Sequence, residues 1–256
     1  MQAEIKGSTM PVLEMILDPG EVIISNHGEL SWMTANLQMS QTTTAGSTGA
    51  GGRGAGLMGG LKRAMSGASI FLTRYEASGA QAMVAFAAKM PGKILPLEVG
   101  PGHGYLVHRH GFVCGTTGIV PTVGFQQSLG GMLFGGEGFI LQKLEGEGTA
   151  WVELSGEITT YDLTEGQSLL VHPGHVGIFE ESVSFQVTRV QGIANRYFGA
   201  DGHWLVVMTG PGKIWLQSMP LPVLAASLRP FIGEAGARDA VAGGAVGGVL
   251  GNILRN

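Results

Sequence analysis

The sequence predicts an all-β protein with three pseudo-repeats related by a pseudo-threefold axis, at residues 12–88, 93–156 and 158–221. The first observation behind this prediction is a Gly-rich loop followed by a strand, a tight turn and a return strand. This pattern occurs in three segments, 59–86, 130–156 and 194–217. Its first strands begin at Ile70, Phe139 and Trp204, which are 69 and then 65 residues apart. Recurrence near one fixed period indicates a repeat architecture.

The second observation is a glycine-bearing turn, a short β-branched run and a second glycine eight or nine residues later. Each hairpin pattern is preceded by one such pair: Gly20 with Gly28, Gly102 with Gly111, and Gly166 with Gly174. Each unit therefore reads turn, strand, turn, strand, Gly-rich loop and hairpin. Short strands with turn signals at regular spacing are typical of a β-sandwich or barrel.

Taken in order, the side chains of residues 10–17 first show an alternating pattern. Asp18-Pro19-Gly20 is then a predicted turn before a strand at 22–25. In the hairpins, we expect the apolar side chains of Phe71, Ile140 and Leu205 to face inward. The tryptophans of the hairpin strands are predicted core anchors: Trp151, Trp204 and Trp215. Two prolines within 219–222 end the strand pattern. We therefore predict one β domain over residues 1–231 and a Gly/Ala-rich tail over 232–256.

Composition favours self-association. Hydrophobic residues make up 44% of the 256 residues and charged residues only 13%, about half the usual charged fraction. Such a chain is expected to cover apolar surface with another subunit or a membrane, and we predict a homo-oligomer, a trimer or ring. The net charge of −4 argues against nucleic-acid binding, which normally requires a basic face.

Targeting signals are lacking in the sequence. Residues 1–9 contain Glu4 and Lys6 and have no apolar core of a secretory signal, and no run reaches the ~20 apolar residues of a spanning helix. We expect a cytoplasmic protein, with a membrane-peripheral location as the alternative. The segment 243–251 places glycines at intervals of four, which fits a flexible tail or a small amphipathic anchor.

Three loops in matching positions of the pseudo-repeats are the predicted interaction surface. The first ends a Ser/Thr/Gly/Ala-rich stretch at 42–60, for which a mobile loop is the plainer interpretation. Apolar residues at loop tips are unusual unless a partner buries them. The predicted interaction residues are Leu57, Met58, Leu61 and Met65 in the first loop, Met132, Leu133 and Phe134 in the second, and Tyr197 and Phe198 in the third.

His108 and His110 are the candidate metal ligands. They follow Gly102 as the His-x-His pair does in the first cupin motif, and strand alternation would place both imidazoles on one face. The cupin pattern then needs a glutamate, but Cys114 and Gly115 stand there. A similar half-match runs from Gly166 to His172. We therefore interpret the histidines as turn or surface residues and predict no metal or other cofactor.

Other catalytic motifs are missing from the sequence. It contains neither a G-x-x-x-x-G-K-[ST] phosphate loop nor a G-x-S-x-G nucleophile elbow. The single cysteine, Cys114, sits in an apolar context without a neighbouring cation, which predicts an inert thiol. These absences favour a non-enzymatic protein.

The order of the hairpin segments resembles one family. The segments are Phe134–Gln142 and Gly212–Ser218, together with residues 59–63, 84–86 and 180–183. They resemble the prokaryotic family of unknown function related to the mitochondrial biogenesis ("altered inheritance of mitochondria") protein. The resemblance implies a fold like that of tryptophan RNA-binding attenuation proteins, a short double-stranded β-helix that tends to form rings. It carries no catalytic or binding residues over to this chain.

Three functions are compatible with these observations. The first is a non-enzymatic scaffold or assembly protein that self-associates and presents its apolar loops to a protein or membrane partner. The second is a cupin-like metal-dependent enzyme using His108 and His110. The third is a ring protein that binds a small ligand or RNA, which fold analogy alone supports weakly.

Overall fold

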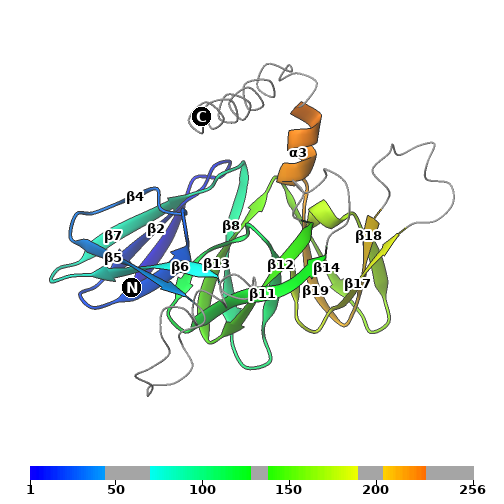
Figure 1. Cartoon of the computed structure of the whole chain (residues 1–256), viewed down its shortest axis with the longest axis horizontal. Coiled ribbons are helices and arrows are strands. Elements are labelled where there is room, and N and C mark those ends of the chain that lie inside the picture. Colours follow the sequence, from blue (N-terminus) through cyan, green and yellow to red (C-terminus); the bar gives the residue numbers. More distant parts are fainter. Residues whose placement is uncertain (44–69, 128–137, 190–203, 229–256) are drawn as a thin grey trace, which may run out of the picture.

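The computed structural model describes residues 1–43, 70–127, 138–189 and 204–228, and this part of the chain is nearly all β-strand. The strands form four sheets that follow one another along the long axis of the molecule, in the order of the sequence (Figure 1). The nine predicted interaction residues and the predicted tail lie outside the described residues.

The first two sheets enclose the first hydrophobic core, which includes Leu13, Tyr75 and Phe86. Sheet 1 has the order β1-β2-β7-β4 and sheet 2 the order β5-β6-β3-β10-β13-β8. Their strands are β1 (Gln2–Lys6), β2 (Val12–Leu17), β3 (Val22–Asn26), β4 (Trp32–Met33), β5 (Leu37–Thr43), β6 (Phe71–Ala77), β7 (Ala82–Ala87), β8 (Gly92–Val99), β10 (Phe112–Thr116) and β13 (Gly148–Ser155).

Sheets 2 and 3 enclose the second core and sheets 3 and 4 the third, so both middle sheets are covered on two faces. Sheet 3 has the order β11-β12-β9-β16-β19-β14, and the shorter sheet 4 has the order β15-β18-β17. Their strands are β9 (Tyr105–His108), β11 (Ile119–Gln127), β12 (Phe139–Gly146), β14 (Ile158–Leu163), β15 (Ser168–Val171), β16 (Val176–Glu180), β17 (Ser184–Arg189), β18 (Trp204–Thr209) and β19 (Gly212–Gln217).

The strand pairings follow one scheme. Within residues 12–87, β2 and β4 both pair with β7, while β3 and β5 both pair with β6. Within 92–155, β8 and β10 pair with β13, and β9 and β11 pair with β12. Within 158–217, β14 and β16 pair with β19, and β15 and β17 pair with β18. Two further pairings, β3 with β10 and β9 with β16, join these segments into the middle sheets.

Three turn glycines lie where the sequence places them. Gly20, Gly102 and Gly166 have φ of 84°, 76° and 74°, in the left-handed region that a residue with a Cβ rarely adopts. Each glycine lies in the turn that leads into the next strand, which is β3, β9 or β15. The predicted tight turn of the middle hairpin also matches, because Gly146 and Gly148 both have positive φ.

The predicted inward direction of three hairpin residues is wrong. Phe71 is 54% exposed, and Ile140 and Leu205 are only partly buried. The fully packed positions are their neighbours Leu72, Leu141 and Val206. Successive side chains of a strand point to opposite faces, so an error of one residue in the phase exchanges the buried and exposed sets.

Strand β1 and helix α3 are among the elements that the sequence did not predict. The polar strand β1 pairs with β2 along its full length and covers that edge of sheet 1. After β19 the chain forms a short helix, α3 (Leu221–Leu228), which projects from the body (Figure 1). The end of the strand pattern near residue 219 is confirmed, since β19 ends at Gln217. No helix in the described ranges is long and apolar enough to cross a membrane.

Candidate functional site

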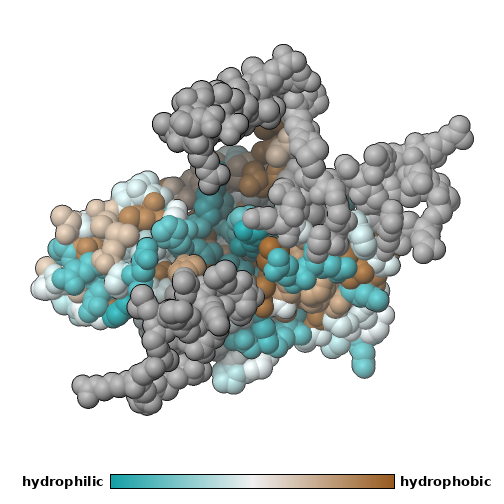
Figure 2. Space-filling view, in the orientation of Figure 1, coloured by the Kyte–Doolittle hydropathy of each residue, from teal (hydrophilic) through white to brown (hydrophobic). Residues whose placement is uncertain are grey.

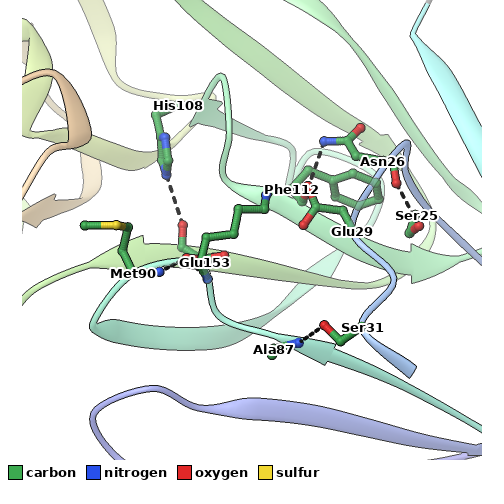
Figure 3. Close-up of polar contacts among 10 residues, drawn as sticks. Ser25, Asn26, Glu29, Ser31, Ala87, Met90, His108, Phe112 and Glu153 are labelled. Atoms are coloured by element: carbon green, nitrogen blue, oxygen red, sulfur yellow. Dashed lines mark hydrogen bonds and ion pairs between the residues drawn. The ribbon is translucent and has the colours of Figure 1, made fainter. Parts of the chain in front are cut away.

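His108 is the last residue of β9 and is held in place by its surroundings. Its Nε2 donates a hydrogen bond to the backbone carbonyl of Glu153, at 3.0 Å (Figure 3). The ring packs over Gly111, where an added Cβ would lie 2.9 Å from Cδ2. Burial lowers the pKa of His108 to about 4, although the hydrogen bond to Glu153 opposes this shift. His108 is therefore neutral at pH 7 and acts as a structural donor.

His110 does not share a strand face with His108, because β9 ends at His108 and His110 lies in the turn before β10. The expected alternation of the two imidazoles is therefore wrong. His110 is exposed, and its pKa is lowered by partial burial and by the nearby cations Arg109 and Lys89. In the described parts of the chain, no group of three His, Cys, Asp or Glu side chains could hold a metal ion.

Cys114 stands where the cupin glutamate would be, and its thiol is inaccessible. It is completely buried in the first core, with its Sγ 3.6 Å from the Sδ of Met15. Burial raises the pKa of the thiol well above its ordinary value. The protonated, enclosed thiol agrees with the inert interpretation.

A cavity of about 190 Å³ lies beside His108, between sheets 2 and 3. It is bounded by the turn that joins β7 to β8, the ends of β9 and β13, the start of β12, and the first residue of α3. The apolar wall includes Phe139, Ile140, Val176 and Leu221. The polar side chains at the cavity include Lys89, Arg109, His110 and Glu153.

Glu153 is a buried carboxylate whose charge is compensated locally. Its Oε1 accepts hydrogen bonds from the backbone N–H groups of Lys89, at 2.9 Å, and Met90, at 3.3 Å. Burial raises its pKa, while Lys89 opposes that shift. The Lys89 ammonium group itself lies 2.5 Å from Oε1 of Glu29, a second carboxyl whose pKa is raised by burial. Lys89 therefore contacts two carboxyl groups, Glu153 of β13 through its backbone N–H and Glu29 of the loop between β3 and β4 through its ammonium group.

Gln217 closes the other side of the cavity. Its Oε1 accepts from the backbone N–H of Ser155, at 3.1 Å, and its Nε2 donates to the carbonyl of Gly174, also at 3.1 Å. Nδ1 of His175 donates to the backbone carbonyl of Gln217, at 2.8 Å. These bonds connect three elements, namely β13, β19 and the turn before β16. They hold the wall of the cavity in place between sheets 2 and 3.

A second candidate site consists of two open strand edges at opposite ends of the molecule (Figure 1). At one end β4 is the edge of sheet 1, and at the other β15 is an edge of sheet 4. Each edge exposes a large apolar side chain, Trp32 at 45% and Leu170 at 58%. Figure 2 shows hydrophobic surface over β4 and β7. Exposed strand edges with apolar side chains are ready to pair with another chain.

Sequence reasoning missed both edges and most of the cavity. The edges could not be found, because their exposure depends on which strands pair across different segments. The cavity offered only one signal, the His108-Arg109-His110 triplet, since the other lining residues come from distant parts of the chain.

The fold and these sites define a class of layered all-β proteins with open terminal sheets and a cavity between the two middle sheets. The family model described as mitochondrial biogenesis AIM24 matches residues 3–219, and the chain belongs to this family. An uncharacterized protein of Streptococcus pyogenes serotype M6 is 27% identical over 229 residues, covering 87% of each chain. A crystal structure of a Streptococcus pyogenes protein aligns with a TM-score of 0.69 at 22% identity. That alignment covers 90% of this chain and 99% of the other, and it shows a shared fold.

Proposed function

We propose that the protein is a non-enzymatic scaffold that self-associates end to end through β4 and β15. The proposal begins with the architecture. The three sets of strand pairings are three copies of one unit, a short double-stranded β-helix of the attenuation-protein type. Two internal joints connect the copies: β3 with β10, and β9 with β16. The next pairing in this series is β15 with β4 of a second chain.

The internal joints predict the register of this intermolecular pairing. Ser25 pairs with Cys114 and Ile24 with Gly115 in the first joint, and Val107 pairs with Ile178 and Leu106 with Phe179 in the second. Because the pairings within each unit also correspond, the next joint places Val171 opposite Trp32 and Leu170 opposite Met33 of the second chain. The joined strands would form a sheet with the order β17-β18-β15-β4-β7-β2-β1, which extends the pattern of the middle sheets.

The observation that carries the proposal is a difference in exposure between corresponding residues. Leu170 corresponds to Ile24 and Leu106, which are 7% and 8% exposed in the internal joints, but it is itself 58% exposed. Trp32 is 45% exposed, whereas its counterparts Cys114 and Ile178 are completely buried. Both ends therefore present the residues that a joint buries. Covering ~200 Å² of apolar surface at ~25 cal/mol per Å² would contribute about 5 kcal/mol before ordering costs.

The contact is heterologous, because one end of the molecule meets the other end of its neighbour. Heterologous contacts close into rings when the rotation between neighbours permits it, and otherwise continue as filaments. A closed ring leaves no open edge at these strands. We expect a small closed ring and take the trimer as its form.

Size-exclusion chromatography with light scattering tests this assembly. The wild-type protein is expected at three times the chain mass of 26.6 kDa. Leu170→Lys and Trp32→Lys each put a charge into the proposed joint and are expected to give monomers with an unchanged melting temperature. The matched control is Tyr161→Lys, on the exposed side of β14 and 44% exposed, which should leave the mass unchanged. A monomeric wild type, or edge variants that still assemble, would contradict the proposal.

The scaffold role adds a partner to the ring. We propose that the apolar loop residues, from Leu61 in the first loop to Phe134 in the second, meet a protein or the surface of a membrane, and that the protein is cytoplasmic or membrane-peripheral. Equivalent loops of a repeat protein emerge on one face, so a ring would present them together and increase avidity. Leu61→Asp combined with Phe134→Asp is expected to weaken partner or liposome binding without lowering the melting temperature. Retention of every association would refute this role for the loops.

A further inference from the structure

The cavity between sheets 2 and 3 has the dimensions and lining of a small-molecule site. Its volume of about 190 Å³ exceeds the ~150 Å³ of a dry apolar cavity that takes up benzene. Phe139 is 3% exposed and Val176 is completely buried, and both form the inner wall. Ile140 and Leu221 extend this apolar lining outward. The inner part therefore suits a hydrocarbon group of a few carbon atoms.

The polar groups deep in the cavity already have partners within the protein. Glu153 accepts two backbone hydrogen bonds, Gln217 uses both ends of its amide, and His108 donates to a backbone carbonyl. Buried polar groups that are satisfied in this way do not require a polar ligand body. An apolar chain can therefore occupy this region without leaving a hydrogen-bonding group unpaired.

The outer part of the cavity carries a cation, Arg109, and the imidazole of His110 as a hydrogen-bonding group. His110 is exposed and Arg109 partly exposed, in contrast to the buried inner wall, and Lys89 is close enough to act on His110 electrostatically. The guanidinium group presents its N–H donors in a fork that matches a carboxylate. The exposure gradient thus places an anion-binding end at the mouth and an apolar end inside.

We propose that this cavity binds a small monocarboxylate with an unbranched apolar chain. The chain lies against Phe139, Ile140 and Val176, and the carboxylate contacts Arg109 and His110 at the mouth. The site is built within one chain, and its formation does not depend on the ring. Binding would place a ligand between two middle sheets and hold the turn at His108 to the start of α3.

Isothermal titration calorimetry with three eight-carbon probes tests the chemical class of the ligand. Octanoate, octanol and octylamine share a chain and differ in charge. We expect saturable binding of one octanoate per chain, weaker binding of octanol, and no saturable binding of octylamine. Octylamine binding as tightly as octanoate, or octanoate failing to bind, would overturn the proposal.

Two substitutions test the orientation of the ligand. Arg109→Gln removes the charge at the mouth and is expected to weaken octanoate about tenfold, while octanol binding changes little. Ile140→Trp places a larger side chain in the apolar lining and is expected to weaken octanoate and octanol alike. The matched control is Arg74→Gln, which removes a cation paired with Glu76 on β6 and does not line the cavity. Unchanged octanoate affinity in Arg109→Gln or in Ile140→Trp, with native melting transitions, would refute this placement.

Discussion

At the scale of single residues, His108 shows how a histidine in a suggestive motif can serve the fold. Its neutral ring donates one hydrogen bond to a backbone carbonyl of the neighbouring sheet. Asn26, at the corresponding place six residues after Gly20, donates from Nδ2 to the carbonyl of Phe112, at 2.9 Å. Both positions carry a side-chain donor to a backbone carbonyl: the Asn26 bond joins β3 to β10 of the next segment, and the His108 bond joins sheet 3 to sheet 2 within residues 92–155. Metal binding is not needed to explain either residue.

The buried imidazole makes stability depend on pH. Folding lowers the pKa of His108 from 6.5 to about 4. Between these two pH values, the unfolded chain therefore binds more protons than the folded chain. Stability is therefore expected to fall as pH decreases from about 6.5 to about 4, by an amount on the order of 3 kcal/mol. His108→Asn keeps a donor and removes the titration, so urea unfolding across this range should show a shallower pH dependence than in the wild type.

Two carboxyl groups act in the opposite direction. Burial raises the pKa of Glu29 and Glu153, so the folded state binds more protons as these groups titrate and their contribution to stability falls as pH rises. The difference between wild type and His108→Asn isolates the histidine from both. Equal pH dependence in the two proteins would mean that His108 is not held in its neutral form by burial.

Metal content provides a second test at this scale. We expect the purified protein to contain no stoichiometric transition metal at His108 and His110, since their side chains leave different structural elements and Nε2 of His108 is already bonded. Elemental analysis by mass spectrometry measures this directly. One tightly bound ion per chain that is lost in His108→Ala would favour the metal-dependent enzyme over the scaffold.

At the scale of elements, the sequence predicted the class of structure and several turns but not the phase of the strands. Glycines such as Gly20 and Gly102 are informative, because their positive φ is a local requirement. The inward side of a strand depends instead on which sheet packs against it. Runs such as Phe139-Ile140-Leu141 are apolar at every position and give no alternation from which to choose.

The observed assignment of inward-facing and outward-facing residues leads to a stability prediction for two adjacent residues of β12. Leu141 is completely buried in the third core, whereas Ile140 is partly exposed. Leu141→Ala should lower the free energy of unfolding by about 2–5 kcal/mol, because it leaves a cavity in a packed core. Ile140→Ala should lower it by clearly less. Urea unfolding compares the two, and a reversed order would show that the assigned faces are wrong.

Elements that depend on tertiary context were beyond sequence reasoning. The strand β1 is mostly polar and each of its residues is exposed, so only its pairing with β2 defines it. The helix α3 begins at a Leu-Pro pair that was interpreted only as the end of a strand pattern. The cavity joins residues from the turn at Lys89 to Leu221, which no local spacing connects. His108 and His110, which form the motif in the sequence, nevertheless line this cavity.

At the scale of the whole molecule, the terminal sheets are the main consequence of the strand order. Sheets 2 and 3 each contain six strands from two adjoining segments, whereas sheets 1 and 4 contain strands from one segment each. In the proposed assembly, the end sheets of neighbouring chains are the two halves of a further six-stranded sheet, with β1 added at its edge. A ring built in this way would give every unit of every chain the same neighbours.

Disulfide trapping tests the proposed joint most directly. Met33→Cys combined with Leu170→Cys places thiols on residues that the inferred register sets opposite each other in neighbouring chains, and the native Cys114 is buried. The two positions belong to sheets 1 and 4, which lie at opposite ends of the molecule (Figure 1), so a bond between them reports an intermolecular contact. We predict covalent multimers up to the closed ring under mild oxidation, and few with Met33→Cys and Ser168→Cys, which are out of register. A double variant that stays monomeric, or that cross-links no better than the out-of-register pair, would contradict end-to-end assembly.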